Sequence, residues 1–76
     1  MTKKIEVFTI NHCPYCDAAK KLLQELGLEY SEINIDGDQT KISELIKRTG
    51  HKTMPQIFIN DAFVGGYTDL KAKLKG

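Results

Sequence analysis

The strongest constraint on the fold is the change of apolar pattern at Cys13. Residues 5–10 before it, Ile-Glu-Val-Phe-Thr-Ile, predict a strand that is apolar on both faces and lies inside a covered sheet. Residues 14–26 after it carry apolar side chains at helical spacing, and Pro14 stands in the first turn, where its missing N–H costs nothing. Cys13 and Cys16 are the only cysteines. A Cys-x-x-Cys at a strand-to-helix junction indicates a redox pair more often than a structural one.

The rest of the chain continues this alternation of patterns. The first helix should end at Gly27, and its apolar stripe is expected from Ala18, Ala19, Leu22, Leu23 and Leu26. A polar edge strand is expected over 28–35, followed by a helix that is capped by Asp38 and ends before Gly50. Strands are then expected over 56–59 and 62–64, joined by a turn at Asn60-Asp61. A short helix over 68–75 follows them. The predicted class is α/β, in the order β-α-β-α-β-β-α, with a four-stranded mixed sheet flanked by three helices. No repeat or linker is visible, so we expect a single domain over residues 1–76.

Composition narrows the classes of partner. The 76 residues allow one small core, and the formal charge of +1 offers no strongly basic face for nucleic acid. The apolar runs are too short to cross a bilayer, and no apolar region follows the basic N-terminus as in a secretory signal. We therefore expect a cytoplasmic protein without nucleic-acid or membrane partners. A disulfide in the cytosol is usually transient and catalytic, and a Cys13–Cys16 bridge closes too short a loop to stabilise the fold much.

Three motifs resemble those of one family, in the family's own order. Cys13-Pro14-Tyr15-Cys16 resembles the active-site tetrapeptide of dithiol glutaredoxins, Thr53-Met54-Pro55 their Thr-Val-Pro motif, and residues 65–70 their Gly-Gly-x-x-Asp-Leu stretch. The resemblance covers nearly the whole chain and implies a thioredoxin fold. It implies a glutathione-dependent thiol–disulfide oxidoreductase that reduces protein disulfides and glutathionylated proteins. By the same resemblance the protein uses glutathione as co-substrate, binds no cofactor or metal, and acts as a monomer.

The two cysteines are expected to have different roles. Cys13 precedes the helix, where free N–H groups and the helix dipole favour a thiolate, so we predict that it is the nucleophile. Cys16 lies one turn into the helix and should be more buried, so we predict that it is the resolving thiol. A lowered pKa reduces the nucleophilicity of a thiol but makes it a better leaving group, which favours exchange in both directions.

The resemblance also implies a substrate site, whose expected residues are Tyr15, Lys52, Thr53, Met54, Pro55, Gly66, Thr68 and Asp69. A cis Met54–Pro55 bond would turn the Met54 main chain toward Cys13, where a substrate could pair with it like an added strand. The helix start at Thr68 and the carboxylate of Asp69 suit the γ-glutamyl end of glutathione, which carries a carboxylate and an ammonium on one carbon. Lys52 or His51 could hold the carboxylate at the other end.

The sequence is also compatible with two other functions. Many glutaredoxins carry a lysine three residues before the first cysteine, whereas this chain has Ile10. A thioredoxin-like disulfide reductase, fed by a flavoenzyme or another small thiol, is therefore the first alternative. An iron–sulfur cluster carrier is the second and belongs to a different class, although two cysteines are too few for a closed metal site within one chain.

Overall fold

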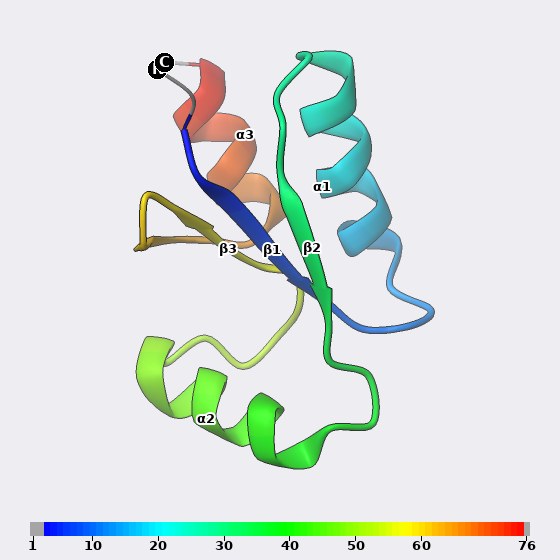
Figure 1. Ribbon diagram of the computed structural model, residues 1–76, viewed down its shortest axis with the longest axis vertical. Coiled ribbons are helices and arrows are strands. Elements are labelled where there is room, and N and C mark those ends of the chain that lie inside the picture. Colours follow the sequence, from blue (N-terminus) through cyan, green and yellow to red (C-terminus); the bar gives the residue numbers. More distant parts are fainter. Residues whose placement is uncertain (1–2, 76) are drawn as a thin grey trace.

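The computed structural model describes residues 3–75 and contains every element that the sequence predicts. In chain order they are β1 (Ile5–Thr9), α1 (Pro14–Glu25), β2 (Ser31–Asn34), α2 (Gln39–Thr49), β3 (Gln56–Ile59), β4 (Ala62–Gly65) and α3 (Tyr67–Lys75). The four strands form one mixed sheet (Figure 1). The predicted class and element order are confirmed.

The topology of the sheet brings distant parts of the chain together. The strand order is β2-β1-β3-β4, with β1 parallel to β2 and antiparallel to β3, and β3 antiparallel to β4. Because β3 runs opposite to β1, the end of β1 and the start of β3 lie at the same edge of the sheet, where Phe8 pairs with Gln56. Cys13, which follows β1, and Pro55, which precedes β3, therefore meet at this edge.

Helices cover both faces of the sheet, as Figure 1 shows with α1 and α3 above it and α2 below. The first face is built from Ile5, Val7, Ala19, Leu23, Ile57, Ile59 and Leu70. The second contains Ile35, Leu45 and Phe58, against which Phe8, Ile10, Ile33, Ile42 and Met54 pack. Side chains alternate along β1, with Ile5 and Val7 toward the first face and Phe8 toward the second, as its two-sided apolar pattern predicts.

Capping and turn residues determine where several of the helices and strands begin and end. The Asp38 side chain accepts the N–H of Lys41 at the start of α2, and Gly50 ends that helix in the left-handed conformation. Asn60 and Asp61 both have positive φ, as a two-residue hairpin turn requires.

Two details of the sequence prediction are wrong. The second strand covers only Ser31–Asn34 rather than residues 28–35, because β1 offers partners only to those residues. Leu26, which was expected in the apolar stripe of α1, is 51% exposed because it is the C-cap, where the chain leaves the helix.

Candidate active site

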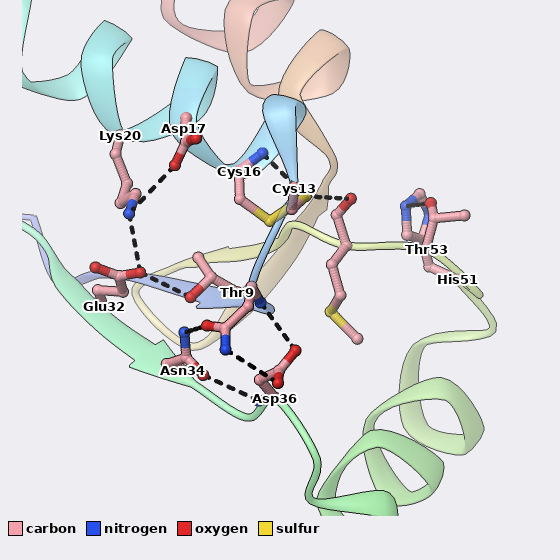
Figure 2. The surroundings of a disulfide bond; sticks show 12 residues. Thr9, Cys13, Cys16, Asp17, Lys20, Glu32, Asn34, Asp36, His51 and Thr53 are labelled. Carbon is pink, nitrogen blue, oxygen red and sulfur yellow. Dashed lines mark hydrogen bonds and ion pairs between the residues drawn. A yellow bond between two sulfur atoms is a disulfide. The ribbon is translucent and has the colours of Figure 1, made fainter.

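Cys13 is the N-cap residue of α1, and its sulfur acts as the capping group. Its backbone is extended, and its Sγ accepts the N–H of Cys16 at 3.2 Å. The two cysteines form a disulfide (Figure 2). When this bond is reduced, a thiolate at Cys13 would keep the same N–H donor and stand at the positive end of the helix dipole. Both effects stabilise the charged form of the thiol.

The two sulfurs differ in their access to solvent. Cys16 is 1% exposed, whereas Cys13 is only partly buried. An incoming disulfide can therefore reach Cys13 first, while Cys16 is reached through the bond to its partner. The difference in burial is the one that the sequence predicts for a nucleophile and a resolving thiol.

The loop before β3 approaches Cys13 from the other side. The Met54–Pro55 peptide bond is cis, and Pro55 is buried. The carbonyl oxygen of Met54 lies 3.6 Å from Cys13 Sγ, as the dashed line in Figure 2 marks. A reduced Cys13 thiol can donate its proton to this carbonyl. The main chain beside Met54 is thus close to the sulfur that would carry a substrate.

A pocket of about 270 Å³ is bordered by Tyr15, which stands between the two cysteines in the chain, and by Met54, whose carbonyl oxygen lies beside Cys13 Sγ. Its lining residues are Tyr15, His51, Thr53, Met54, Pro55, Gly66, Tyr67, Thr68 and Asp69. Asp69 Oδ2 accepts the Gly66 N–H at 3.1 Å, and Gly65 has a φ of 129°. A side chain at Gly65 would collide with the Asp69 carboxylate, so glycine allows this carboxylate to fold back over the start of α3. The pocket thus combines a helix N-terminus with an acidic side chain.

The pocket gathers seven of the eight residues predicted to bind substrate. Lys52 is exposed and is not among the lining residues, so its role stays a prediction. His51, the other cation considered, lines the pocket, and its Nε2 lies 3.1 Å from Thr53 Oγ1. Tyr67 also lines it and was not predicted. Its ring centroid lies 6.2 Å from that of Tyr15, a contact between α1 and α3 that no local pattern reveals.

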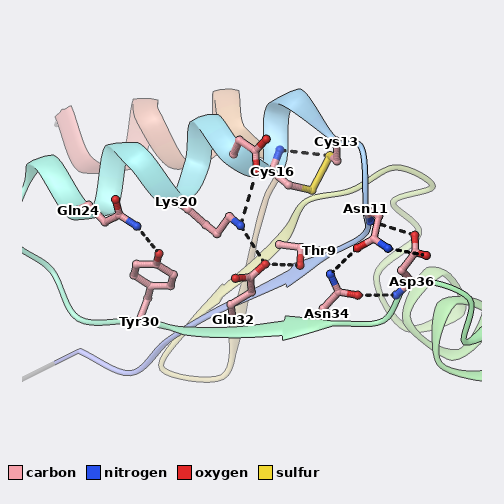
Figure 3. A network of polar contacts seen from close by, with 11 residues as sticks. Thr9, Asn11, Cys13, Cys16, Lys20, Gln24, Tyr30, Glu32, Asn34 and Asp36 are labelled. Carbon is pink, nitrogen blue, oxygen red and sulfur yellow. Dashed lines mark hydrogen bonds and ion pairs between the residues drawn. A yellow bond between two sulfur atoms is a disulfide. The ribbon is translucent and has the colours of Figure 1, made fainter.

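A polar network lies on the other side of the disulfide (Figures 2 and 3). The buried Thr9 hydroxyl donates to Glu32 Oε2 at 2.8 Å, and Lys20 Nζ lies 3.0 Å from the same oxygen. The Thr9 hydroxyl and then Lys20 lower the pKa of Glu32, and the hydrogen bond to Glu32 raises the pKa of Lys20. Lys20 thus connects α1 to β2.

A second network of hydrogen bonds fixes the loop that leads into Cys13. Asp36 Oδ1 accepts the Asn11 main-chain N–H at 2.9 Å, and Asp36 Oδ2 accepts its side-chain amide at 3.1 Å. Asn34 Nδ2 donates to Asn11 Oδ1 at 3.1 Å (Figure 3). Residue His12, exposed and with a φ of 54°, then turns the chain into α1. The network thus ties the end of β1 to the end of β2 and holds the segment before the nucleophile.

Residues 3–75 contain neither a cluster of metal-ligating side chains nor a helix suited to crossing a membrane. No group of three or more His, Cys, Asp or Glu residues in this range is placed to hold a metal ion. None of the helices described in this range has both the length and the apolar character needed to span a membrane.

A redox-active cysteine pair at the start of α1, beside a cis-proline loop in this mixed sheet, defines a thiol–disulfide oxidoreductase of the thioredoxin superfamily. The glutaredoxin family model matches residues 5–64, and the chain therefore belongs to the glutaredoxin family. It is 47% identical over 68 residues to Glutaredoxin 3 of Escherichia coli K12, covering 90% of this chain and 82% of that protein.

Solved structures agree with this assignment. Glutaredoxin 1 from Francisella tularensis, complexed with cacodylate, superposes with a TM-score of 0.85 at 33% identity, covering 97% of this chain and 94% of that one. A buckwheat glutaredoxin–glutathione complex superposes with a TM-score of 0.88 at 30% identity, covering 96% of this chain and 69% of that one.

Proposed function

We propose that the chain is a glutathione-dependent oxidoreductase in which Cys13 is the nucleophile and Cys16 the resolving thiol. One observation supports this most directly. The pocket beside Cys13 contains both the N-terminal end of α3 and the Asp69 carboxylate. This pairing suits a ligand that carries a carboxylate and an ammonium on one carbon, as the γ-glutamyl end of glutathione does. The glutathione complex of the buckwheat relative supports the same ligand.

The reaction with a glutathionylated protein has two exchange steps. The Cys13 thiolate attacks the glutathione sulfur of the mixed disulfide, a Cys13–glutathione disulfide forms, and the protein thiolate leaves. A second glutathione thiolate then attacks the glutathione sulfur held on Cys13. Glutathione disulfide is released, and the Cys13 thiolate is restored. The Cys16 N–H, 3.2 Å from Cys13 Sγ, stabilises the thiolate at the beginning and at the end.

Protein disulfides follow a different second step. Cys13 attacks one sulfur of the target and releases the other as a thiolate. The Cys16 thiol then loses its proton and attacks Cys13, which frees the target and leaves the Cys13–Cys16 disulfide. Two molecules of glutathione reduce this disulfide by the same exchange chemistry. The burial of Cys16 favours its use as the second rather than the first nucleophile.

Each part of the pocket has an expected contact with glutathione. The Met54 main chain pairs with the cysteinyl residue of the ligand like an added strand, and Thr53 and Pro55 shape that wall. The γ-glutamyl carboxylate meets the N–H groups at the start of α3, near Gly66 and Thr68. Asp69 uses Oδ2 for Gly66, which leaves Oδ1 for the γ-glutamyl ammonium.

The aromatic and basic side chains complete these contacts. Tyr15 covers the bound sulfur, and the second carboxylate of glutathione meets His51 or Lys52, the two residues that precede Thr53. We further propose that residues 1–76 act as one monomeric domain in the cytoplasm. Glutathione serves this domain as a co-substrate and does not remain bound.

Paired assays test the proposal. The first follows deglutathionylation of a peptide mixed disulfide with glutathione and glutathione reductase, and the second follows insulin reduction with a thioredoxin reductase. We expect saturable activity in the first assay. Activity in the second assay alone would overturn the proposal in favour of a thioredoxin-like reductase. Cluster absorbance in protein purified without oxygen would support an iron–sulfur carrier instead.

A further inference from the structure

A buried amide lies beneath the loop that forms one wall of the pocket. Gln56 is fully buried at the start of β3, although its side chain is polar. Strand alternation places it on the same face as Phe58, which is the face that α2 covers. A buried amide is costly unless its donor and acceptor both find partners, so this residue requires a specific set of contacts.

Thr49, at the end of α2, supplies the central contact. Its Oγ1 lies 2.9 Å from Gln56 Oε1 and 2.9 Å from the Leu45 carbonyl oxygen, and it accepts the His51 N–H at 3.1 Å. Gln56 Nε2 in turn donates to the His51 carbonyl oxygen. Both main-chain polar groups of His51 are therefore held by side chains from two different elements, α2 and β3.

His51 connects this buried pair to the pocket. Its Nε2 lies 3.1 Å from Thr53 Oγ1, and its ring meets the Phe63 ring edge-on at 5.6 Å. The same nitrogen would lie 3.5 Å from a Cβ atom built on Gly66, so the ring borders the opposite wall. Three residues after His51, the Met54 carbonyl lies beside Cys13 Sγ. Fixing His51 thus fixes the wall that faces both the ligand and the nucleophile.

We propose that Thr49 and Gln56 are positioning residues that set the affinity of the pocket for its thiol ligand without touching that ligand. The inference rests on the proposed function, because it concerns how the same pocket holds glutathione. Cys13 is activated separately by the N-terminus of α1. Loss of the Thr49 hydroxyl should therefore weaken substrate binding while leaving the reactivity of Cys13 unchanged.

The test compares Thr49→Val with Thr49→Ser. Valine keeps the shape of threonine but leaves the Gln56 acceptor and the His51 N–H without their partner, whereas serine keeps the hydroxyl. We expect Thr49→Val to raise KM for a glutathionylated peptide about tenfold, because small displacements of a binding wall are costly, with kcat little changed. Thr49→Ser should restore the wild-type KM. Thr40→Val, at the exposed start of the same helix, is the matched control.

Two further measurements separate positioning from general loss of structure. Alkylation of reduced Cys13 by iodoacetamide should proceed at the wild-type rate in Thr49→Val, and exchange of the His51 amide hydrogen should be faster. The proposal would be overturned by an unchanged KM, by an unchanged His51 exchange rate, or by a loss of Cys13 alkylation as large as the loss of substrate affinity. If Thr49→Val does not fold, Gln56→Met is measured in its place, because it removes the contacts of Gln56 with Thr49 Oγ1 and with the His51 carbonyl oxygen.

The amide exchange also separates this inference from the function that it refines. If the wild-type protein has no activity on glutathionylated peptide, the proposed function fails. Faster His51 exchange in Thr49→Val would then still show that Thr49 orders the loop. An unchanged exchange rate would reject the positioning role on its own.

Discussion

The two sides of the Cys13–Cys16 disulfide are built from similar residues but differ in what their polar groups contact. On the β2 side, Thr9, Lys20 and Glu32 bind one another. On the pocket side, His51, Thr53, Thr68 and Asp69 line an open hollow of about 270 Å³. Figure 2 shows Lys20 and Glu32 on one side of the disulfide and His51 and Thr53 on the other.

This comparison separates a structural cluster from a binding site. Polar groups that already satisfy one another gain little from a ligand, because binding would first have to break their hydrogen bonds. The pocket-side groups also make hydrogen bonds, His51 with Thr53 and Asp69 with the Gly66 N–H, but they line a hollow that a ligand can enter. Substitutions on the β2 side should therefore change the free energy of unfolding, and substitutions on the pocket side should change KM.

The largest effect is expected at the nucleophile itself. Cys13→Ser should abolish both deglutathionylation and disulfide reduction, because serine supplies no thiolate. Cys16→Ser should keep deglutathionylation, which needs only one thiol, and lose the resolution of protein disulfides. Both activities are measured with glutathione and glutathione reductase. Reductase activity retained in Cys13→Ser would contradict the assignment of the nucleophile.

The next largest effect is expected at Asp69. Asp69→Ala removes the proposed partner of the ligand ammonium, and a hydrogen bond to a charged group is worth about 1.5–3 kcal/mol, so KM should rise about tenfold or more. It also removes the cap on Gly66. Asp38→Ala removes a comparable cap from α2, far from the pocket lining. Equal KM values in the two variants would show that Asp69 acts only as a cap.

A smaller change is expected from Ile10→Lys, which introduces the lysine that many glutaredoxins carry. The added charge should lower KM for the glutathionylated peptide a few-fold, since a solvent-exposed ion pair contributes roughly 0.2–1 kcal/mol. Ile10→Met, which is long but uncharged, separates charge from shape. Ile10 packs against the second core cluster, so thermal unfolding is recorded alongside the kinetics. Equal KM values in Ile10→Lys and Ile10→Met would show that charge at position 10 does not affect substrate binding.

The smallest effect is expected at Glu32, and it should appear in stability rather than in KM. Because the folded protein lowers the pKa of Glu32, the carboxylate stabilises the fold above its unfolded pKa of about 4.3, and the contribution disappears as the pH falls through the lower folded value. Glu32→Gln should cost roughly 0.2–1 kcal/mol at neutral pH.

Urea unfolding at neutral and acidic pH measures this difference. The gap between wild type and Glu32→Gln should narrow as the pH falls below about 4. A gap that stays constant over this range would show that the charge of Glu32 does not contribute. A raised KM in Glu32→Gln would contradict the assignment of the β2 side to stability and of the pocket side to binding.

The parts of the molecule that local patterns determine were predicted well. The capping residues Asp38 and Gly50, the turn at Asn60-Asp61 and the reversal of pattern at Cys13 act through neighbouring backbone groups, so the sequence alone locates them. The family motifs identified the cysteine pair and most of the pocket lining.

The contacts between distant residues were not predicted. Thr9 and Glu32 meet because β1 and β2 are parallel in one particular register, and Tyr67 meets Tyr15 because α3 crosses beside α1. Thr49 and Gln56 were likewise not singled out, since a threonine at a helix end and a glutamine in a strand carry no local signal. Such pairs depend on the packing of whole elements, which periodicity does not describe.

Gly65 has a consequence for how the specificity of this enzyme could be redesigned. Its φ of 129° disfavours other residues, and a side chain there would displace the carboxylate that covers the start of α3. The neighbouring Thr68 is exposed and lines the pocket without such a restriction. A library of variants aimed at new thiol substrates should therefore keep Gly65 constant. It should vary Thr68 and the partly exposed Tyr67, which line the same pocket, while the backbone at the start of α3 stays unchanged.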